Sequence, residues 1–291
     1  MSRRSILSIA AFAAVLVLAY LGTELWLTRK LEERVEALAR QLPPSVTLNI
    51  GQSGVRLFGY QARVADVVVS GPAGRLRIAD IAFNHFDFSH DVPNYASGTV
   101  HGLAIEAAEA APEARALMTE LGYERVAFDI AFAYRYDPDK TLFTLENLRI
   151  DGARVGRLAL NAEVVNVATL APETPLAMLA LMLRAALGKA TLSYRDDGLA
   201  ERLQAREARR TGVALADYRA RLVRDFDDAM AKAADDGPRE AIGRLKAFVE
   251  RPGGVTLQAA PRQPVPLFRV AASRNPAVAL RLLGVTVINE P

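Results

Sequence analysis

Three histidines lie in one short stretch of the chain, where they are the best candidates for metal chemistry. His85, His90 and His101 have Asp87 and Asp91 as neighbours, and imidazole with carboxylate is a ligand set that several divalent ions accept. His85 is flanked by phenylalanines, however, and the DVPN sequence that starts at Asp91 is typical of a loop. We therefore interpret the stretch as a strand and a loop, and we predict no metal site and no cofactor.

Asp196 and Asp197 are adjacent carboxylates that could be imagined as an acid–base pair. They come directly before a predicted helix, where carboxylates more often cap free backbone N–H groups and interact with the helix dipole. No serine-nucleophile motif, HExxH sequence, P-loop or dinucleotide fingerprint occurs in the chain. The absence of cysteine excludes disulfides, thiol catalysis and thiolate metal sites. The sequence thus predicts a non-enzymatic protein without catalytic residues.

The charge of the chain is nearly balanced, with a formal net charge of +3. Lys and Arg are matched by Asp and Glu along the C-terminal half, and no basic patch of the kind that binds nucleic acid stands out. We predict no nucleic-acid partner.

Residues 6–26 (ILSIAAFAAVLVLAYLGTELW) form an apolar segment that decides which compartment the rest of the chain faces. As a helix this segment would span roughly 31 Å, which matches a hydrocarbon core of about 30 Å. Arg3 and Arg4 favour a cytoplasmic N-terminus, and Trp26 stands where an aromatic belt residue is expected. We predict an uncleaved, single-pass signal anchor in a bacterial inner membrane, with the bulk of the chain periplasmic. A cleaved secretory signal and a buried helix are the alternatives, although no persuasive cleavage site follows.

Breaker residues and changes of pattern divide the chain into five parts. Pro43 and Pro44 end the first helical stretch, since proline cannot donate to the helix ladder and restricts the residue before it. The parts are a signal anchor at 1–26, a membrane-proximal helix at 27–44, an antiparallel β domain at 45–170, a helical region at 171–251, and C-terminal strands with a short helix at 252–291 that return to the sheet.

The most regular pattern after the anchor predicts a long strand with one apolar face. Large side chains alternate with small or polar ones from Val126 to Tyr136, a span of roughly 33 Å at about 3.3 Å per residue. Short turns join this strand to its neighbours, which predicts an antiparallel meander. Such a face has to be covered by helices, a second sheet, a ligand or a partner. The side chains that we expect to contact an apolar ligand are Val126, Phe128, Ile130, Phe132 and Tyr134.

A second apolar element is predicted at residues 172–187, where LAMLALMLRAAL is apolar on almost every side and Gly188 follows as a stop. This helix is too short to cross a bilayer. It is either buried against the sheet, or it is a movable lid or a surface that touches lipid. Met178 and Met182 lie four residues apart and suit an adaptable apolar contact with the same ligand.

Three more helices are predicted between residues 199 and 249, with breaks at Gly212 and at Gly237. Charges of both signs fill their outer faces. The expected fold class is therefore α+β: a single N-terminal transmembrane helix, then a long-stranded antiparallel sheet covered by a C-terminal helical half.

Three stretches of sequence, GVRLFGYQARVADVVVSG, TLENLRIDGARVGRLALNAEV and LSYRDDGLAERLQAREARRTGV, follow the anchor and its helical extension. In this layout the chain resembles bacterial envelope proteins of the AsmA-like and related uncharacterised groups. The resemblance implies a role in envelope lipid homeostasis and carries over no functional residue. AsmA-like proteins are generally much longer, so the resemblance does not imply a bridge between membranes.

Two non-enzymatic functions follow from these features. The preferred hypothesis is a membrane-tethered periplasmic protein that binds a membrane lipid or other apolar ligand against the long sheet. The alternative is an envelope scaffold or assembly factor that binds an envelope protein through its helical half. An enzyme is the least favoured class, because no catalytic motif is present.

Overall fold

The computed structural model of the protein describes residues 43–56, 61–87, 89–90, 92–170, 174–233, 235–273 and 276–290. The predicted anchor at residues 6–26 and the predicted helix at 27–44, apart from its last two residues, lie outside this part of the chain. Across the described ranges, no helix combines the length and the apolar character that a bilayer crossing requires.

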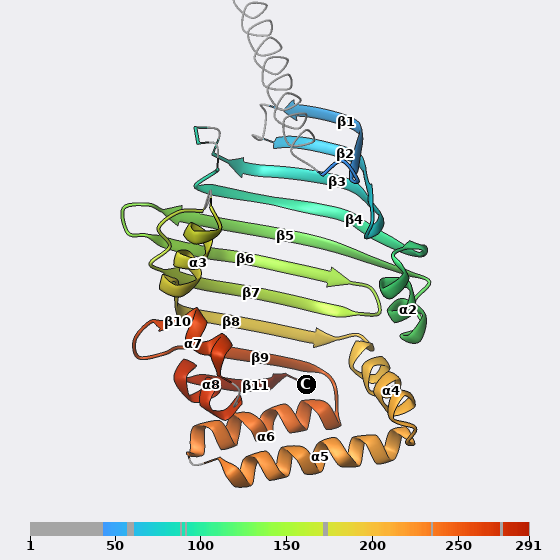
Figure 1. Ribbon diagram of the computed structural model, residues 1–291, viewed down its shortest axis with the longest axis vertical. Helices are drawn as coiled ribbons and strands as arrows, with labels where there is room; N and C mark the ends of the chain where they lie inside the picture. The colour runs from blue at the N-terminus through green and yellow to red at the C-terminus, as the bar shows by residue number, and fades with distance from the viewer. Residues whose placement is uncertain are drawn as a thin grey trace, which may run out of the picture.

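A single antiparallel sheet of 11 strands dominates the molecule (Figure 1). Ten of its strands pair in the order β1-β2-β3-β4-β5-β6-β7-β8-β9-β11, and β10 pairs with β8 off this path. Each strand up to β9 therefore lies beside the strand that precedes it in the sequence. The strands are β1 (Thr47–Arg56), β2 (Gln61–Gly71), β3 (Gly74–Phe86), β4 (Tyr95–Ala110), β5 (Arg125–Asp137), β6 (Leu142–Gly152), β7 (Gly156–Val165), β8 (Ala186–Asp196), β9 (Gly254–Ala259), β10 (Val265–Pro266) and β11 (Val285–Glu290).

The helices lie at the two ends of the strands and beyond the last strand (Figure 1). α2 (Pro112–Glu120) joins β4 to β5, and α4 (Leu199–Thr211) follows β8 at the same end of the sheet. α3 (Pro175–Arg184) joins β7 to β8 at the opposite end, where α7 (Leu267–Ala272) and α8 (Pro276–Leu283) also lie. α5 (Leu215–Lys232) and α6 (Asp236–Glu250) form an antiparallel pair beside β11.

The predicted fold class is wrong, because the described part of the C-terminal half is not a helical layer over the sheet. β8, β9 and β11 continue the same sheet into the region expected to be helical, and the sheet runs to the last described residue. α6 packs on β11 and on α5, so the apolar sides of these two helices are covered by one another and by the last strand of the sheet. The helices predicted between residues 199 and 249 are thus present, but α6 packs at the edge of the sheet and not over its long central strands.

Several local predictions are confirmed. The long strand expected at 126–136 is β5, and the three helices expected between 199 and 249 are α4, α5 and α6. The helix expected at 172–187 ends earlier, at Arg184, and Gly188 lies inside β8. Ala186 and Leu187 pair with Pro266 and Val265, so strand pairing overrides the helical tendency of these residues.

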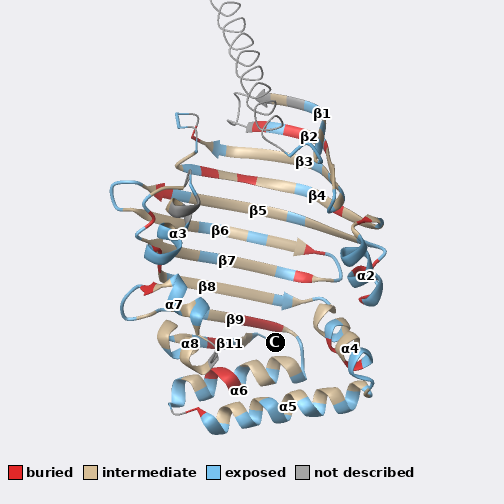
Figure 2. Cartoon of the chain, viewed as in Figure 1, coloured by how far each residue is buried: buried red, intermediate tan, exposed pale blue. Residues whose placement is uncertain are grey.

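Among the described residues, two small clusters of buried side chains stand out. Ala110, Met118, Leu121 and Tyr123 pack together between α2 and the sheet. At the C-terminal edge of the sheet, Ala241 of α6 packs on Val255 of β9 and on Val287 of β11. Within the described ranges, no large side chain is less than 2% exposed, and Figure 2 shows strands of intermediate exposure between a few buried positions. The middle of the sheet therefore lacks a covering layer of the usual kind.

Candidate functional site

One side of the sheet, called the apolar face below, is built on β5. Val126, Phe128, Ile130, Phe132 and Tyr134 alternate along β5 and are all half-buried, as the sequence predicts. Their partners on the neighbouring strands are also apolar: Ile130, for example, lies between Val100 of β4 and Ile150 of β6. The predicted ligand-contacting residues of β5 are thus brought together on one surface.

The strand registers extend this face across the whole sheet in two rows. Directly opposed residues lie within about 5.5 Å of each other, so each row is a continuous band of side chains. The first row, from β2 to β9, is Val64, Ile81, Val100, Ile130, Ile150, Leu158, Tyr194 and Val255. The second, from β2 to β11, is Ala62, Phe83, Gly98, Phe132, Leu148, Leu160, Leu192, Leu257 and Val287.

Exposure changes along both rows. The rows begin with buried residues in β2 and end with buried residues at Val255 and Val287, which are 5% and 4% exposed. Between these ends, the large side chains of β3 to β8 are only half-buried (Figure 2). In the described part of the chain, no helix packs broadly on β5, β6 or β7. The middle of the apolar face is therefore an extended apolar surface that the described helices leave incompletely covered.

Aromatic rings and glycines shape the middle of this face. The ring of Phe132 lies 6.1 Å from that of Phe83 in an edge-on arrangement, and Tyr134 stacks on Phe143 at 5.8 Å. Gly152 lies opposite Phe128, where an added Cβ would come within 2.7 Å of the phenyl ring. Gly152 thus leaves room for the flat ring of Phe128 against the sheet.

The tyrosines of the apolar face offer no free hydroxyl group. The hydroxyl of Tyr134 donates to the carbonyl of Pro93 at 3.2 Å and that of Tyr136 to the carbonyl of Val167 at 2.8 Å. The hydroxyl of Tyr194 lies 2.7 Å from the carbonyl of Val155 and 2.9 Å from the carboxylate of Asp196, and it can donate to either. Burial raises the pKa of all three phenols. These residues therefore present their rings, and not an acid or a base, to anything that lies on this face.

The opposite face of the sheet is polar and carries ion pairs between neighbouring strands. Arg77 pairs with Glu109 at 2.7 Å and Lys189 with Glu163 at 2.8 Å, with mostly exposed side chains. Two open depressions, of about 380 and 480 Å³, also lie here; the first is lined by Asp129, Asp151 and Arg157 among others. The charged, hydrated side chains around the first depression do not favour an apolar ligand.

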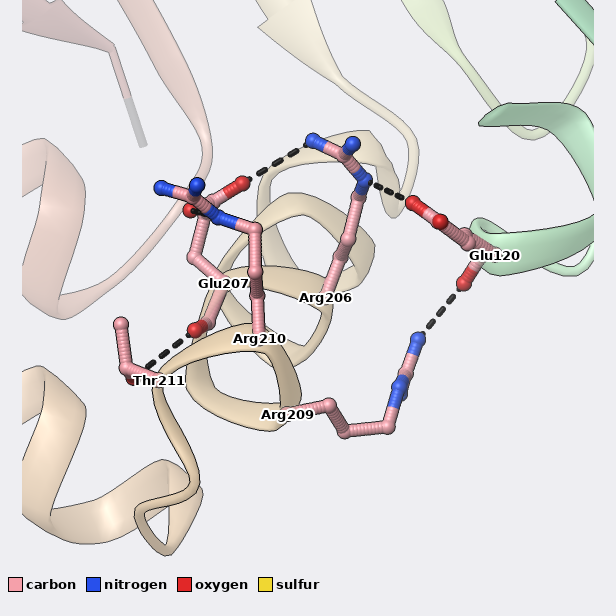
Figure 3. Close-up of polar contacts among 6 residues, drawn as sticks. All are labelled: Glu120, Arg206, Glu207, Arg209, Arg210 and Thr211. Carbon is pink, nitrogen blue, oxygen red and sulfur yellow. Dashed lines mark hydrogen bonds and ion pairs between the residues drawn. The ribbon is translucent and has the colours of Figure 1, made fainter. Parts of the chain in front are cut away.

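The α2 end of the sheet is closed by contacts between α2 and α4 (Figure 3). The carboxylate of Glu120 accepts a hydrogen bond from Arg206 at 2.5 Å, and its backbone carbonyl accepts one from Arg209 at 2.6 Å. The guanidinium of Arg202 lies 4.9 Å from the centre of the Tyr123 ring. These contacts join two segments that are far apart in the sequence and lie over the ends of the intervening strands.

Helix α3, which carries the two methionines, shows no extensive packing on β5 among the described residues. α3 makes its most extensive packing with α7 among the described elements. The Met182 side chain is 59% exposed, whereas the side chain of Met178 is outside what the structure describes. The expectation that both methionines line the same surface as Phe128 and Phe132 therefore finds no contact to support it.

The three histidines diverge to separate partners. His85 lies 3.2 Å from the hydroxyl of Ser97, His90 lies 2.6 Å from Asp87, and His101 lies 3.5 Å from Asp129. Among the side chains that the structure describes, no three metal-ligating groups meet.

Asp87 organises the loop between β3 and β4. The carboxylate is 4% exposed and accepts hydrogen bonds from the backbone N–H groups of Ser89 and Asn94. Burial alone would raise the pKa of the Asp87 carboxyl, but these bonds, together with His90, outweigh it and lower the pKa to about 2. Asp87 is thus a structural carboxylate that remains ionised.

Asp196 binds backbone N–H groups at the start of α4, as the capping interpretation predicts, whereas Asp197 binds a different segment of the chain. Asp196 accepts hydrogen bonds from the backbone N–H groups of Gly198 and Ala200 at the start of α4, each at 2.9 Å. Asp197 accepts one from the backbone N–H of Arg154, also at 2.9 Å. Both carboxylates thus accept backbone hydrogen bonds that hold the chain, and both also line the first depression described above.

Sequence reasoning missed most of the apolar face, because it predicted neighbouring strands in a meander but not which of their residues stand opposite β5. Apolar and polar residues also alternate in the neighbouring strands. This alternation does not predict which residues face each other, because bulges change the register between Val100 and Leu103 in β4 and between Leu145 and Leu148 in β6. A shift of one residue would turn every later side chain to the other face.

Comparison with known proteins assigns no activity to this site. A family model described only as "Uncharacterized protein" matches residues 149–290, which begin in β6 and include every later strand and helix. A search of curated proteins finds no match. The resemblance to AsmA-like proteins, the lipid ligand and the inner-membrane location all stay predictions from the sequence.

Proposed function

We propose that the protein is a membrane-tethered, periplasmic component of envelope lipid homeostasis that holds an apolar ligand on the apolar face of its sheet. The class of ligand that fits best is a lipid acyl chain. The single observation that carries the proposal is the pair of apolar rows, which are half-buried from β3 to β8 and have no broad helical cover. Such a surface is expected to be covered by a ligand, a partner protein or a membrane.

The dimensions suit an acyl chain. At about 4.8 Å between neighbouring strands, the part of the rows from β3 to β8 is roughly 24 Å long. One leaflet of a bilayer contributes about half of a hydrocarbon core of about 30 Å, so a single acyl chain is shorter than the rows. Each CH₂ group that such a chain buries contributes about 0.8 kcal/mol.

The chemistry of the face also favours a hydrocarbon over a polar ligand. The hydroxyls of Tyr134, Tyr136 and Tyr194 already have hydrogen-bond acceptors within the chain, so the rows provide rings and aliphatic groups. A polar headgroup would stay at the edge of the sheet, where water can solvate it.

A photoactivatable phospholipid with the reactive group in its acyl chain tests this proposal on the full chain in native membranes. We expect crosslinks to peptides of β5, β6 and β7. Leu148→Glu should remove them, because Leu148 lies in the second row and is directly opposed to Phe132 and Leu160.

Asn147→Glu is the matched control, since it adds the same charge one residue away at an exposed position. It should leave the crosslinks unchanged. Crosslinks confined to residues 1–44, or crosslinks that survive in Leu148→Glu, would overturn the proposal.

The second candidate function is a scaffold that binds an envelope protein through the helices beside β11. It is favoured by α5, which packs on α6 and contributes no buried residue of its own. Crosslinking in intact membranes followed by peptide mapping should then place a partner protein on α5. Crosslinks to a partner that avoid α5 would count against this candidate.

A further inference from the structure

The large apolar side chains that remain exposed are concentrated at the end of the sheet where α3 lies. α3 contributes Leu179, Met182 and Leu183, which are spaced i, i+3 and i+4 and therefore share one side of the helix. α7 contributes Leu267 and Phe268. Leu179 is 52% exposed and Phe268 is 43% exposed. These five residues are called the α3–α7 patch.

The two helices of the patch are held side by side. The backbone N–H of Leu267 donates to the carbonyl of Ala185, immediately after α3, at 2.9 Å. β10 pairs with the start of β8, where Val265 faces Leu187, and α7 follows β10 directly. Leu187 pairs in turn with Val164 of β7. The patch is therefore continuous with the apolar face at this end of the strands.

Basic residues accompany the patch. Residues 174–185 and 261–273 contain Arg184, Arg262 and Arg269 and no Asp or Glu; the nearest acid in the sequence, Glu173, lies outside the described residues. All three arginines are exposed. By contrast, Arg206 at the α2 end is paired with the carboxylate of Glu120. Within the part of the chain that the structure describes, Arg184, Arg262 and Arg269 have no acidic partner.

We infer that the α3–α7 patch docks on the surface of an anionic phospholipid bilayer. An apolar helical side next to unpaired arginines is the pattern of interfacial membrane binding, in which the apolar side chains enter the acyl boundary and the arginines meet phosphate groups. A second copy of the chain would bring two unbalanced sets of arginines together. The patch lies where a lipid would enter or leave the apolar face. This role for the patch rests on the proposed function, whereas the contact with the bilayer follows from the apolar side chains and the arginines alone.

The absence of cysteine allows a direct test on the full chain, reconstituted in vesicles. A single cysteine is introduced as Leu183→Cys and labelled with an environment-sensitive fluorophore. Leu117→Cys on α2, at an exposed apolar position on the opposite end of the sheet, is the matched control. In vesicles of phosphatidylcholine with phosphatidylglycerol, the emission at residue 183 should shift to the blue and that at residue 117 should not. Pure phosphatidylcholine and high salt should each reduce the shift.

Charge neutralisation completes the test. Arg184→Gln with Arg269→Gln should lower the ratio of docked to free label by about 25-fold, since each basic residue near an anionic surface contributes about fivefold. Arg221→Gln with Arg224→Gln on α5, which removes the same charge from exposed sites, should leave the ratio unchanged.

Three results would overturn the inference: equal emission at residues 183 and 117, a shift that does not depend on anionic lipid, or a shift that appears with increasing protein concentration in the absence of vesicles. The last would assign the patch to a second copy. None of these results depends on the crosslinks to β5–β7, so the inference and the proposed function can fail separately.

Discussion

β9 and β11 carry the same alternation of apolar and polar residues as β5, yet the two regions differ in what covers them. At the C-terminal edge, α6 lies against Val255 and Val287, and Ala241 of the helix is 2% exposed. In the middle of the sheet, Ile130 and Phe132 occupy the same rows and stay half-buried. Alternation along a strand thus determines which face is apolar, but not whether the chain itself covers that face.

The largest difference between the two regions should appear when a charge is placed in a row. Val287→Asp should lower the free energy of unfolding by about 4 kcal/mol or more, because the carboxylate would be buried without a partner. Ile130→Asp, in the half-exposed middle, should cost about 1–2 kcal/mol. Urea denaturation measures both. Equal losses would mean that the middle of the sheet is as well covered as the edge, which would contradict the comparison.

Steric crowding gives the next largest effect. A Cβ added at Gly98 would collide with the carbonyl oxygen of Ala82 and lie 3.2 Å from the ring of Phe132. Gly98→Ala should therefore destabilise the protein by about 1–3 kcal/mol. Gly237→Ala in α6 is the control, since a Cβ there meets nothing within 4 Å and alanine favours helix. If thermal unfolding shows no difference between the two variants, β4 and β5 are not packed as closely as described.

Asp87 should make the free energy of unfolding sensitive to acid, through the loop between β3 and β4. Its pKa of about 2 lies below the ordinary value of 3.8, so the ionised carboxylate stabilises the folded state fully above pH 4. This contribution should be lost as the pH falls from about 4 to about 2. Asp87→Asn should cost about 1–3 kcal/mol at neutral pH, because two backbone N–H groups lose their charged acceptor.

Stability curves of Asp87→Asn and of Asp139→Asn, in the exposed hairpin after β5, are the measurement. Only the Asp87 variant should flatten the acid limb of the curve. An unchanged limb would show that the loop between β3 and β4 does not depend on this carboxylate.

The smallest effect is expected at the α2 end. Glu120→Gln removes the charge that pairs with Arg206 but leaves the carbonyl that accepts from Arg209 (Figure 3). The Glu120 side chain is 52% exposed, so the loss should be below about 1 kcal/mol and should shrink further in high salt. A larger loss would indicate that the contact between α2 and α4 supports the neighbouring strands as well.

The sequence by itself determined the local elements of this protein. β5 with its apolar side, the three helices between 199 and 249, and the capping role of Asp196 follow from side-chain period, breaker residues and hydrogen-bonding capacity, all of which act over a few residues. The same local grounds place the five predicted residues of β5 on one side of one strand, and the structure has them there. They say nothing about where Met178 and Met182 lie, because α3 belongs to a connection whose position depends on long-range pairing.

Only the tertiary structure decided how the elements combine. Pairing between β8, β9 and β11 involves residues far apart in the sequence, and bulges in β4 and β6 set which side chains stand opposite one another. No short-range pattern encodes either of these. The sequence predicts a sheet followed by a helical half, whereas strand pairing extends one sheet to β11 and places α6 at its edge. The central apolar rows were thereby left half-exposed, because a strand can specify its apolar side without specifying what will lie against it.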